Sequence, residues 1–185
     1  MTSAFRFCPA CATALQEIVA DEDGGPKARL RCPACGWTHW NNPTPVLAAV
    51  IELPEHDGKL LLARNAAWPE GMFGLITGFM EAGESPEDGI RREVAEETSL
   101  AVRSLALIGA YDFQRMNQII IAYHAVATGK VRLSPELIDH RLIAPDKARC
   151  WRAGTGYALA DFLKSRGFEP QWFDRPPLAR PPSPP

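Results

Sequence analysis

Long apolar runs and an excess of one charge are both missing from this sequence. No stretch of about 20 apolar residues is present, and the amino-terminal MTSAFRFCPACATALQ lacks the basic start and apolar core of a signal peptide. We therefore expect a cytoplasmic protein that does not span a membrane. The net charge is only -2, which argues against a strong general affinity for nucleic-acid backbone or anionic membranes. Any polyanion has to be held locally or through a metal ion.

Cysteine is scarce except near the amino terminus. Four of the five cysteines form two near-identical pairs, Cys8-Pro-Ala-Cys11 and Cys32-Pro-Ala-Cys35. Two C-x2-C pairs at about this separation are typical of four thiolates around one tetrahedral zinc ion. The alternatives are two disulfides, which a reducing compartment disfavours, and a site in which His39 replaces one thiolate. Because four thiolates leave zinc no open position, we expect this metal to stabilise structure and to do no chemistry.

The composition divides the chain into two modules and a tail. Residues 1–40 form a zinc ribbon too small to bury a core without its metal, and residues 41–170 form the second module. Residues 171–185 are rich in proline, so we expect a disordered tail there. The remaining cysteine, Cys150, is expected to be a buried or idle thiol.

The second module is expected to mix strands with helices. Runs rich in β-branched and aromatic residues predict strands at 46–53 and 59–64, around a hairpin turn, and at 101–113 and 117–127. Ser85 and Pro86 are typical of a helix start and predict a helix over 86–97. A second, amphipathic helix is predicted from residue 155, with Gly167 as its stop.

The first of these helices carries three glutamates at helical spacing. Glu93, Glu96 and Glu97 fall on one face, where they repel one another, and they lie toward the carboxyl end, where the helix dipole disfavours negative charge. A divalent cation such as Mg2+, which takes oxygen ligands, would remove that cost. The alternative is a solvated face whose charges are balanced by Arg91 and Arg92.

The surrounding residues favour the metal site, because they follow a longer pattern, G-x5-E-x7-R-E-U-x-E-E-x-G-U, in which U is a bulky aliphatic residue. The matching positions are Gly78, Glu84, Arg92, Glu93, Val94, Glu96, Glu97 and Leu100. This pattern resembles the Nudix box, the signature of the Nudix hydrolases. Ser99 stands where the family has its last glycine. We expect that position to be a left-handed turn just past the helix, where serine costs on the order of 1 kcal/mol and removes no ligand.

The resemblance implies an α/β fold, the α/β/α sandwich on a mixed sheet, preceded here by the zinc ribbon. It implies hydrolysis of a diphosphate that links a nucleoside to another group, with Mg2+ or Mn2+. The three helix glutamates look like the metal ligands, Arg92 looks like the residue that orients one of them, and Glu84 assists through the metals or their waters. The general base is left open among Glu96, Glu97 and Glu136, and the alternative for Glu136 is a surface turn residue.

A four-cysteine ribbon before a Nudix domain resembles the NADH pyrophosphatase branch, whose members cleave NAD(H) to nicotinamide mononucleotide and AMP. Some members remove NAD caps from RNA, and a homodimer is implied by the same resemblance. This chain lacks the branch's Ser-Gln-Pro-Trp-Pro-Phe-Pro run after the box and has different residues from Gly109 to Asn117. ADP-ribose and FAD therefore stay open as substrates beside NADH. The rival from another class is a non-catalytic nucleotide sensor or RNA-binding protein on a Nudix scaffold.

Residues for substrate binding are expected among the aromatic side chains near the box. Phe79, Tyr111, Phe113 and Tyr123 can each stack a nucleobase, and the alternative for each is a place in the core. Gln118 can hydrogen-bond an adenine edge or cap a strand.

Overall fold

A computed structural model of the chain describes residues 5–174. These residues fall into two compact units, divided between Asn42 and Pro43. Within the described range, no helix is both long enough and apolar enough to cross a membrane.

The first unit is a small antiparallel sheet that follows the first cysteine pair. Its strands lie in the order β1-β2-β3 and are β1 Gln16–Glu22, β2 Gly25–Arg31 and β3 Thr38–His39. The second cysteine pair forms the turn between β2 and β3. Cys8 and Cys32 are buried, whereas the other described residues of this unit are partly or fully exposed. The shortage of buried apolar side chains agrees with a fold that depends on a metal.

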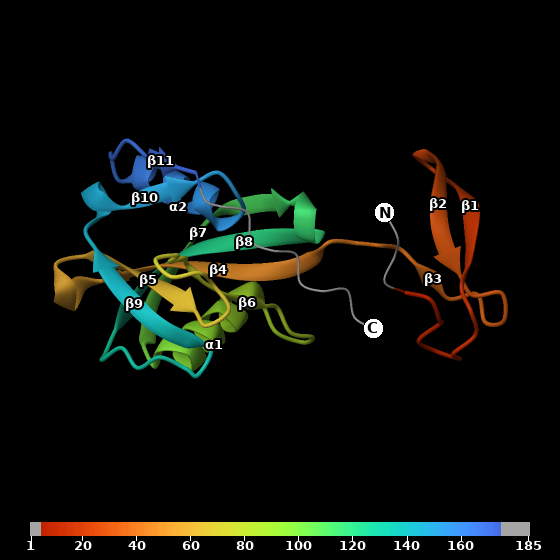
Figure 1. Cartoon of the computed structure of the whole chain (residues 1–185), viewed down its shortest axis with the longest axis horizontal. Coiled ribbons are helices and arrows are strands. Elements are labelled where there is room, and N and C mark those ends of the chain that lie inside the picture. The colour runs from red at the N-terminus through yellow and green to blue at the C-terminus, as the bar shows by residue number, and fades with distance from the viewer. Residues whose placement is uncertain (1–4, 175–185) are drawn as a thin grey trace. The chain divides into compact units, whose positions relative to one another are not determined.

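The second unit is built on a six-stranded mixed sheet (Figure 1). Its order is β7-β8-β4-β5-β9, and β6 pairs with the start of β4 on the same side as β5. Only the β4–β8 pair is parallel. The strands are β4 Thr44–Leu53, β5 Lys59–Asn65, β6 Ile76–Phe79, β7 Ala101–Phe113, β8 Gln118–Thr128 and β9 Leu137–Ile143. Short 3-10 turns occur at Pro54–His56, Gln114–Met116 and Pro145–Lys147.

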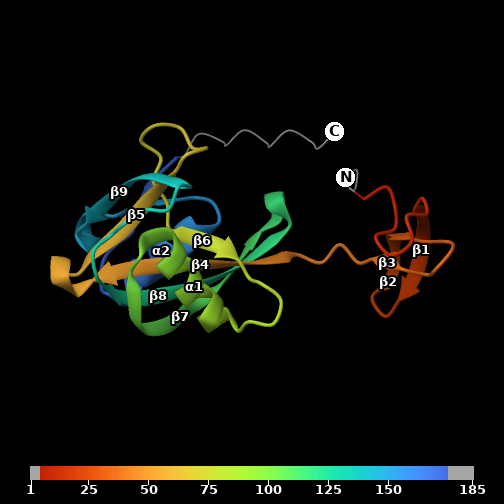
Figure 2. The same ribbon diagram turned by 90° about the horizontal axis from the view of Figure 1, so that it is seen from below.

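Two helices, α1 Pro86–Thr98 and α2 Thr155–Ser165, cover opposite faces of this sheet (Figure 1). Figure 2 shows α1 lying across β4 when the molecule is seen from below. The central strand β4 is buried on both faces, which explains its nearly continuous apolar run. Leu47 and Ile51 face α1, whereas Val46 and Val50 face α2. The α/β/α sandwich on a mixed sheet is thereby confirmed.

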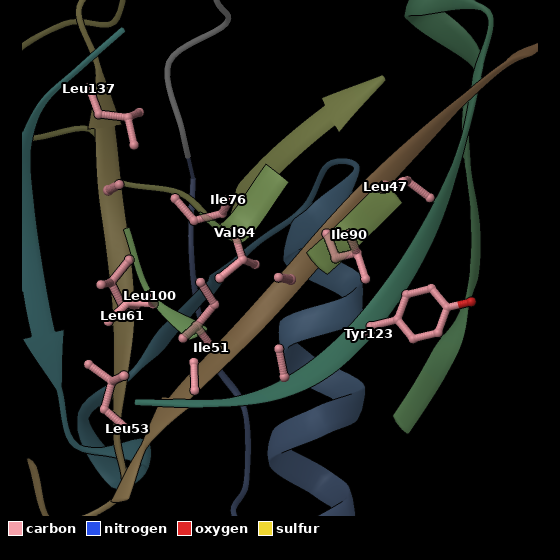
Figure 3. Packing of buried hydrophobic residues seen from close by; sticks show 14 residues of the cluster. Leu47, Ile51, Leu53, Leu61, Ile76, Ile90, Val94, Leu100, Tyr123 and Leu137 are labelled. Atoms are coloured by element: carbon pink, nitrogen blue, oxygen red, sulfur yellow. The ribbon is translucent and has the colours of Figure 1, made fainter. Parts of the chain in front are cut away.

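On the α1 side of the sheet, buried apolar side chains of the helix and of several strands form one core (Figure 3). Ile90 and Val94, one turn apart on α1, are completely buried against Leu47 and Ile76. The same helical spacing leaves Glu93 beside them at the boundary of the core, with only 9% of the residue exposed. Burial of the apolar stripe therefore fixes where the box glutamates lie.

The ends of α1 follow the sequence signals. Ser85 accepts a hydrogen bond from the Asp88 backbone N–H at 3.1 Å, and its hydroxyl donates to the Asp88 carboxylate at 2.7 Å. Ser99 caps the other end in the left-handed conformation, with φ 59° and ψ 18°, and its N–H donates to the Ala95 carbonyl. The left-handed turn expected at Ser99 is confirmed, so serine occupies a conformation that favours glycine.

The carboxyl-terminal part packs on the other face. Helix α2 ends before Gly167, as predicted, and a parallel pair of short strands, β10 Arg149–Trp151 and β11 Gln171–Phe173, lies beside it. Strand β11 falls inside the stretch from residue 171 that we expected to be a tail, and the rest of that stretch, 175–185, lies outside the described residues. Cys150 on β10 is fully buried, and burial raises the pKa of its thiol to about 11.

Candidate active site

The first glycine of the box is required by a glutamate of α1. A Cβ placed on Gly78 of β6 would lie 1.8 Å from the carboxyl carbon of Glu93 and 2.0 and 2.2 Å from its oxygens. The Glu93 carboxylate thus rests directly on the backbone of β6. Only glycine leaves room for it, which gives a steric reason for the spacing between these two box positions.

Arg92 holds three carboxylates together. Its guanidinium donates to both oxygens of Glu84, at 2.8 and 3.1 Å, to Glu93 at 2.8 Å and to Glu96 at 3.1 Å. It also donates to the Phe79 carbonyl of β6 at 3.2 Å. These bonds raise the pKa of Arg92, so it stays charged. The hydrogen bonds from Arg92 lower the pKa of Glu84, with a smaller contribution from the Glu81 backbone N–H.

Glu97 lies beside this group but has a different environment. Burial, followed by the charges of Glu93, Glu136 and Glu96, raises its pKa to about 7. A carboxyl group with such a pKa can hold or release a proton near neutral pH. Arg92 bonds to Glu84, Glu93 and Glu96, whereas no such bond from Arg92 to Glu97 is among the hydrogen bonds above.

Glu136 reaches this group from a distant part of the sequence. The Ser134 N–H donates to the Glu97 carbonyl at 3.0 Å, and the Ala66 N–H donates to the Glu136 carbonyl at 2.8 Å. The segment that carries Glu136 is thereby tied to the end of α1. Sequence reasoning left Glu136 open between a surface turn and a reacting acid, and the structure brings it close enough to Glu97 to raise the pKa of that carboxyl group.

The oxygen-rich group fits a hard divalent cation. Four carboxylates lie near enough to repel one another, and one of them, Glu93, is locked against the Gly78 backbone. Carboxylate oxygens are the kind of ligand that Mg2+ prefers, and it usually keeps several water ligands as well.

The four cysteines of the first unit fit zinc. The sulfur-to-sulfur distances are 3.5 Å for Cys11 and Cys32, 3.6 Å for Cys8 and Cys35, and 3.7 Å for Cys11 and Cys35. Sulfurs about 2.3 Å from a tetrahedral ion lie about 3.8 Å apart, so the spacing matches and is far too long for disulfides. His39 instead packs against Phe5 and Trp37 and is not part of this cluster. The expected four-thiolate site is thus present without His39.

Three of the four expected aromatic residues share one face of the sheet. Cross-strand neighbours run in one row from Tyr111 through Ile120 and Val46 to Phe79. Directly opposed side chains lie on the same face, which here is the face toward α2. Phe113 packs on this face as well, and Gln118 is its cross-strand partner. We call this surface of Phe79, Tyr111, Phe113 and Gln118 the aromatic floor.

Tyr123 does not join the aromatic floor. It is 4% exposed on the α1 face, and its hydroxyl donates to Glu87 in the first turn of α1 at 2.9 Å. Burial, followed by this bond, raises the pKa of Tyr123 to about 12, so the phenol remains a donor. Tyr123 thus connects β8 to α1 through a hydrogen bond. The sequence alone did not indicate its partner, Glu87.

Gly89 is a further constrained position that sequence reasoning missed. A Cβ there would lie 2.5 Å from Leu47 and 2.6 Å from the Glu84 carboxylate. Glycine inside a helix costs about 1 kcal/mol relative to alanine, so its presence in α1 was a signal of close approach.

Two family models match the chain. Residues 43–162 match the NUDIX domain, and residues 6–41 match the family described as Nudix N-terminal, a zinc ribbon. Together they cover both units.

Among curated relatives, the NAD-capped RNA hydrolase NudC of Mycobacterium tuberculosis (strain ATCC 25177 / H37Ra) is 37% identical over 111 residues, covering 56% of this chain and 34% of that one. The protein of the same name from Stutzerimonas stutzeri is 30% identical over 138 residues, covering 74% and 47%. The chain therefore spans between about a third and a half of the length of these relatives.

Solved structures share the fold. A Nudix hydrolase from Nitrosomonas europaea superposes with a TM-score of 0.71 at 22% identity, covering 92% of this chain and all of the other. An ADP-ribose pyrophosphatase from Streptococcus suis gives 0.55 at 18% identity, covering 71% and 100%. At these identities the likeness concerns the fold alone.

Proposed function

This chain belongs to the Nudix family, and we propose that it hydrolyses the diphosphate bond of a nucleoside diphosphate derivative. One observation carries the proposal: Arg92 gathers Glu84, Glu93 and Glu96, while Glu97 beside them has a pKa raised to about 7. All box carboxylates are present and most are held by hydrogen bonds. A protein that only sensed nucleotides would not need to keep every one of these carboxylates.

The residues that would hold Mg2+ or Mn2+ are Glu93, Glu96 and Glu97. When bound, such an ion neutralises diphosphate charge and lowers the pKa of a water molecule. Arg92 fixes the orientation of two of these ligands, because it donates to Glu93 and Glu96 at once. Arg92 in turn is fixed by the bidentate pair with Glu84.

Proton transfer is assigned to Glu97. Before a cation binds, burial and the charges of Glu93, Glu136 and Glu96 raise its pKa to about 7, so it can take up a proton near neutral pH. Glu96, 61% exposed, is less suited because one of its oxygens already accepts a hydrogen bond from Arg92. Glu136 acts through its charge on Glu97 or, in the alternative assignment, accepts the proton itself.

The aromatic floor is assigned to a nucleobase of the substrate. Phe79 is 59% exposed and follows Gly78 on β6, but its side chain is on the face of the sheet opposite the Glu93 carboxylate, so a substrate that stacks a ring on it has to pass around the end of β6 to reach the carboxylates. Gln118 can hydrogen-bond the edge of that base. The names of the relatives favour NAD-capped RNA as a carrier of this bond. The family resemblance puts NADH first, with AMP plus a mononucleotide as products, and ADP-ribose and FAD are the alternatives.

The test is a product analysis with Glu97→Gln as the key variant. The purified chain is incubated with NADH, NAD, ADP-ribose, FAD and an NAD-capped RNA, with Mg2+ or Mn2+, and the products are identified by mass. We expect turnover of at least one substrate and at least a hundredfold loss in Glu97→Gln. Glu87→Gln, on the same helix but bonded to Tyr123, is the matched control and should keep most of the rate.

Each outcome bears on the assignment. No turnover of any substrate, with binding retained, would favour the nucleotide sensor. A near-normal rate in Glu97→Gln combined with a large loss in Glu136→Gln would transfer the role of the base to Glu136. Sedimentation of the same preparation tests the homodimer that the family resemblance implies.

A further inference from the structure

A hollow of about 340 Å3 lies on the α2 face of the sheet and contains none of the carboxylates of α1. Its walls come from β7, α2 and β11, and the residues that matter here are Tyr111, Tyr157, Asp161, Lys164 and Trp172. We call it the α2 hollow. Its volume is at the lower end of the range of about 300 to 1,000 Å3 typical of small-molecule sites. Of these residues the proposed hydrolysis uses only Tyr111, which belongs to the aromatic floor; Tyr157, Asp161, Lys164 and Trp172 have no role in it.

One wall of the α2 hollow is aromatic. The Tyr157 and Trp172 rings lie 5.8 Å apart, tilted by 53°, and the Arg152 guanidinium stands 5.1 Å from the centre of the Trp172 ring. Tyr157 is 41% exposed. Trp172 is partly exposed, and rings in such a position offer flat faces on which a planar heterocycle can stack.

A fixed carboxylate stands opposite these rings. The Tyr111 hydroxyl donates to one Asp161 oxygen at 2.9 Å, and Lys164 donates to the other at 3.2 Å. Burial, followed by the Asp161 bond, raises the pKa of Tyr111, so the phenol stays a donor. Asp161 is still 49% exposed, and a carboxylate has about four acceptor positions, of which two are used. The remaining acceptor positions of Asp161 can bind a ligand. Because Tyr111 and Lys164 already hold the carboxylate, its side chain loses little conformational entropy on binding.

We propose that the α2 hollow is a second binding site, which takes a ribonucleoside: the base stacks on Tyr157 and Trp172, and the 2′ and 3′ hydroxyls donate to Asp161. Neighbouring hydroxyls are donors that match a carboxylate, as in the ribose contacts of dinucleotide-binding folds. A phosphate group would instead meet the Asp161 charge, and Lys164 is already paired. The site thus selects the nucleoside part of a ligand and leaves any phosphate directed to solvent.

The test follows the indole N–H signals of the five tryptophans by NMR while adenosine is added without Mg2+, with Trp172→Phe to assign the signal of Trp172. We expect the Trp172 signal to shift, and 2′,3′-dideoxyadenosine to bind at least about tenfold more weakly than adenosine. Free ribose should bind far more weakly than adenosine, because it has no base to stack. Equal affinity for adenosine and its dideoxy form, shifts confined to other tryptophans, or binding of ribose as tight as adenosine would each overturn the proposal.

A matched pair of variants tests the carboxylate. Asp161→Asn should reduce the preference for adenosine over dideoxyadenosine to nearly none. Asp146→Asn is the control, because Asp146 also pairs with a lysine, at 3.3 Å, and is 51% exposed, yet it lies outside the α2 hollow. It should retain the full preference. A preference unchanged in Asp161→Asn would contradict the assignment, whatever the outcome of the hydrolysis assays.

Discussion

The contact between Gly78 and Glu93 yields the sharpest test of the proposed active site. In Gly78→Ala, the new Cβ would lie 1.8 Å from the Glu93 carboxyl carbon, whereas real Cβ contacts are essentially never below 3.0 Å. The Gly78 backbone is not left-handed, so alanine introduces no conformational strain of its own. The whole effect must therefore come from displacement of the carboxylate.

The size of the effect follows from that distance. The Glu93 carboxylate has to retreat by more than about 1 Å, whereas a metal site tolerates errors of about 0.2 Å in its ligand distances. A misplacement of about 1 Å can cost a hundredfold in rate, which corresponds to about 3 kcal/mol. The crowding should also lower the free energy of unfolding by about 1 to 3 kcal/mol. The variant should thus fold but bind Mg2+ weakly and turn over slowly.

The assay combines calorimetric titration with Mg2+ and measurement of kcat/KM on a substrate that the parent hydrolyses. Gly83→Ala is the control, because Gly83 lies in the same box with φ +89° and nothing near its would-be Cβ. Gly83→Ala should lose about 1 kcal/mol of stability through backbone strain and keep its kinetics. If Gly78→Ala kept both its Mg2+ affinity and its rate, Glu93 would not be a ligand at the position described.

Three further predictions follow from individual contacts. Ser99→Gly should raise the free energy of unfolding by about 0.5 to 1 kcal/mol, as measured by urea denaturation, with unchanged kinetics, because it relieves a left-handed serine. Mg2+ should bind more weakly as the pH falls below 7, because protons and the cation compete for Glu97, whose metal-free pKa is raised to about 7. Glu136→Gln should lower that pKa, because the charge of Glu136 contributes to raising it. The Mg2+ affinities measured by calorimetry at pH 8 and pH 6 should therefore differ less in this variant than in the parent. Cys32→Ser should reduce bound zinc from about one per chain to nearly none in a metal assay. Hydrogen exchange of the amides in the first unit should become faster, while amides beyond Pro43 stay protected. Full zinc content in the variant would contradict the four-thiolate site.

Local signals in the sequence were sufficient for most elements of the fold. The Ser85 cap and the run of β-branched residues after Leu100 predicted α1 and β7 at nearly their observed bounds. The cysteine spacing predicted the sulfur cluster, because two C-x2-C turns can present their thiols to only a few geometries. Such features depend on residues close together in the chain, and their physics is local.

Positions set by distant contacts were beyond sequence reasoning. Glu136 approaches Glu97 only because hydrogen bonds of Ser134 and Ala66 tie its segment to the end of α1 and to the loop after β5. These are backbone hydrogen bonds between distant segments, and no residue pattern around Glu136 predicts them. The separation of Tyr123 from Tyr111 also depends on strand pairing: Tyr111 of β7 is opposite Ile120 of β8, and Tyr123 is three residues beyond Ile120, on the other face of the sheet.

The alternation along β6 also explains why a Nudix box does not by itself identify a substrate. Gly78 and Phe79 are consecutive, so their Cα substituents project to opposite faces of the sheet. Gly78 meets Glu93 on the α1 face, where the proposed hydrolysis is assigned, and Phe79 joins Tyr111 on the α2 face, where the base is assigned. Residues beyond Phe79 on the floor come from β7 and β8, outside the box. Selection among NADH, ADP-ribose and FAD can therefore change through those two strands while every box carboxylate remains in place.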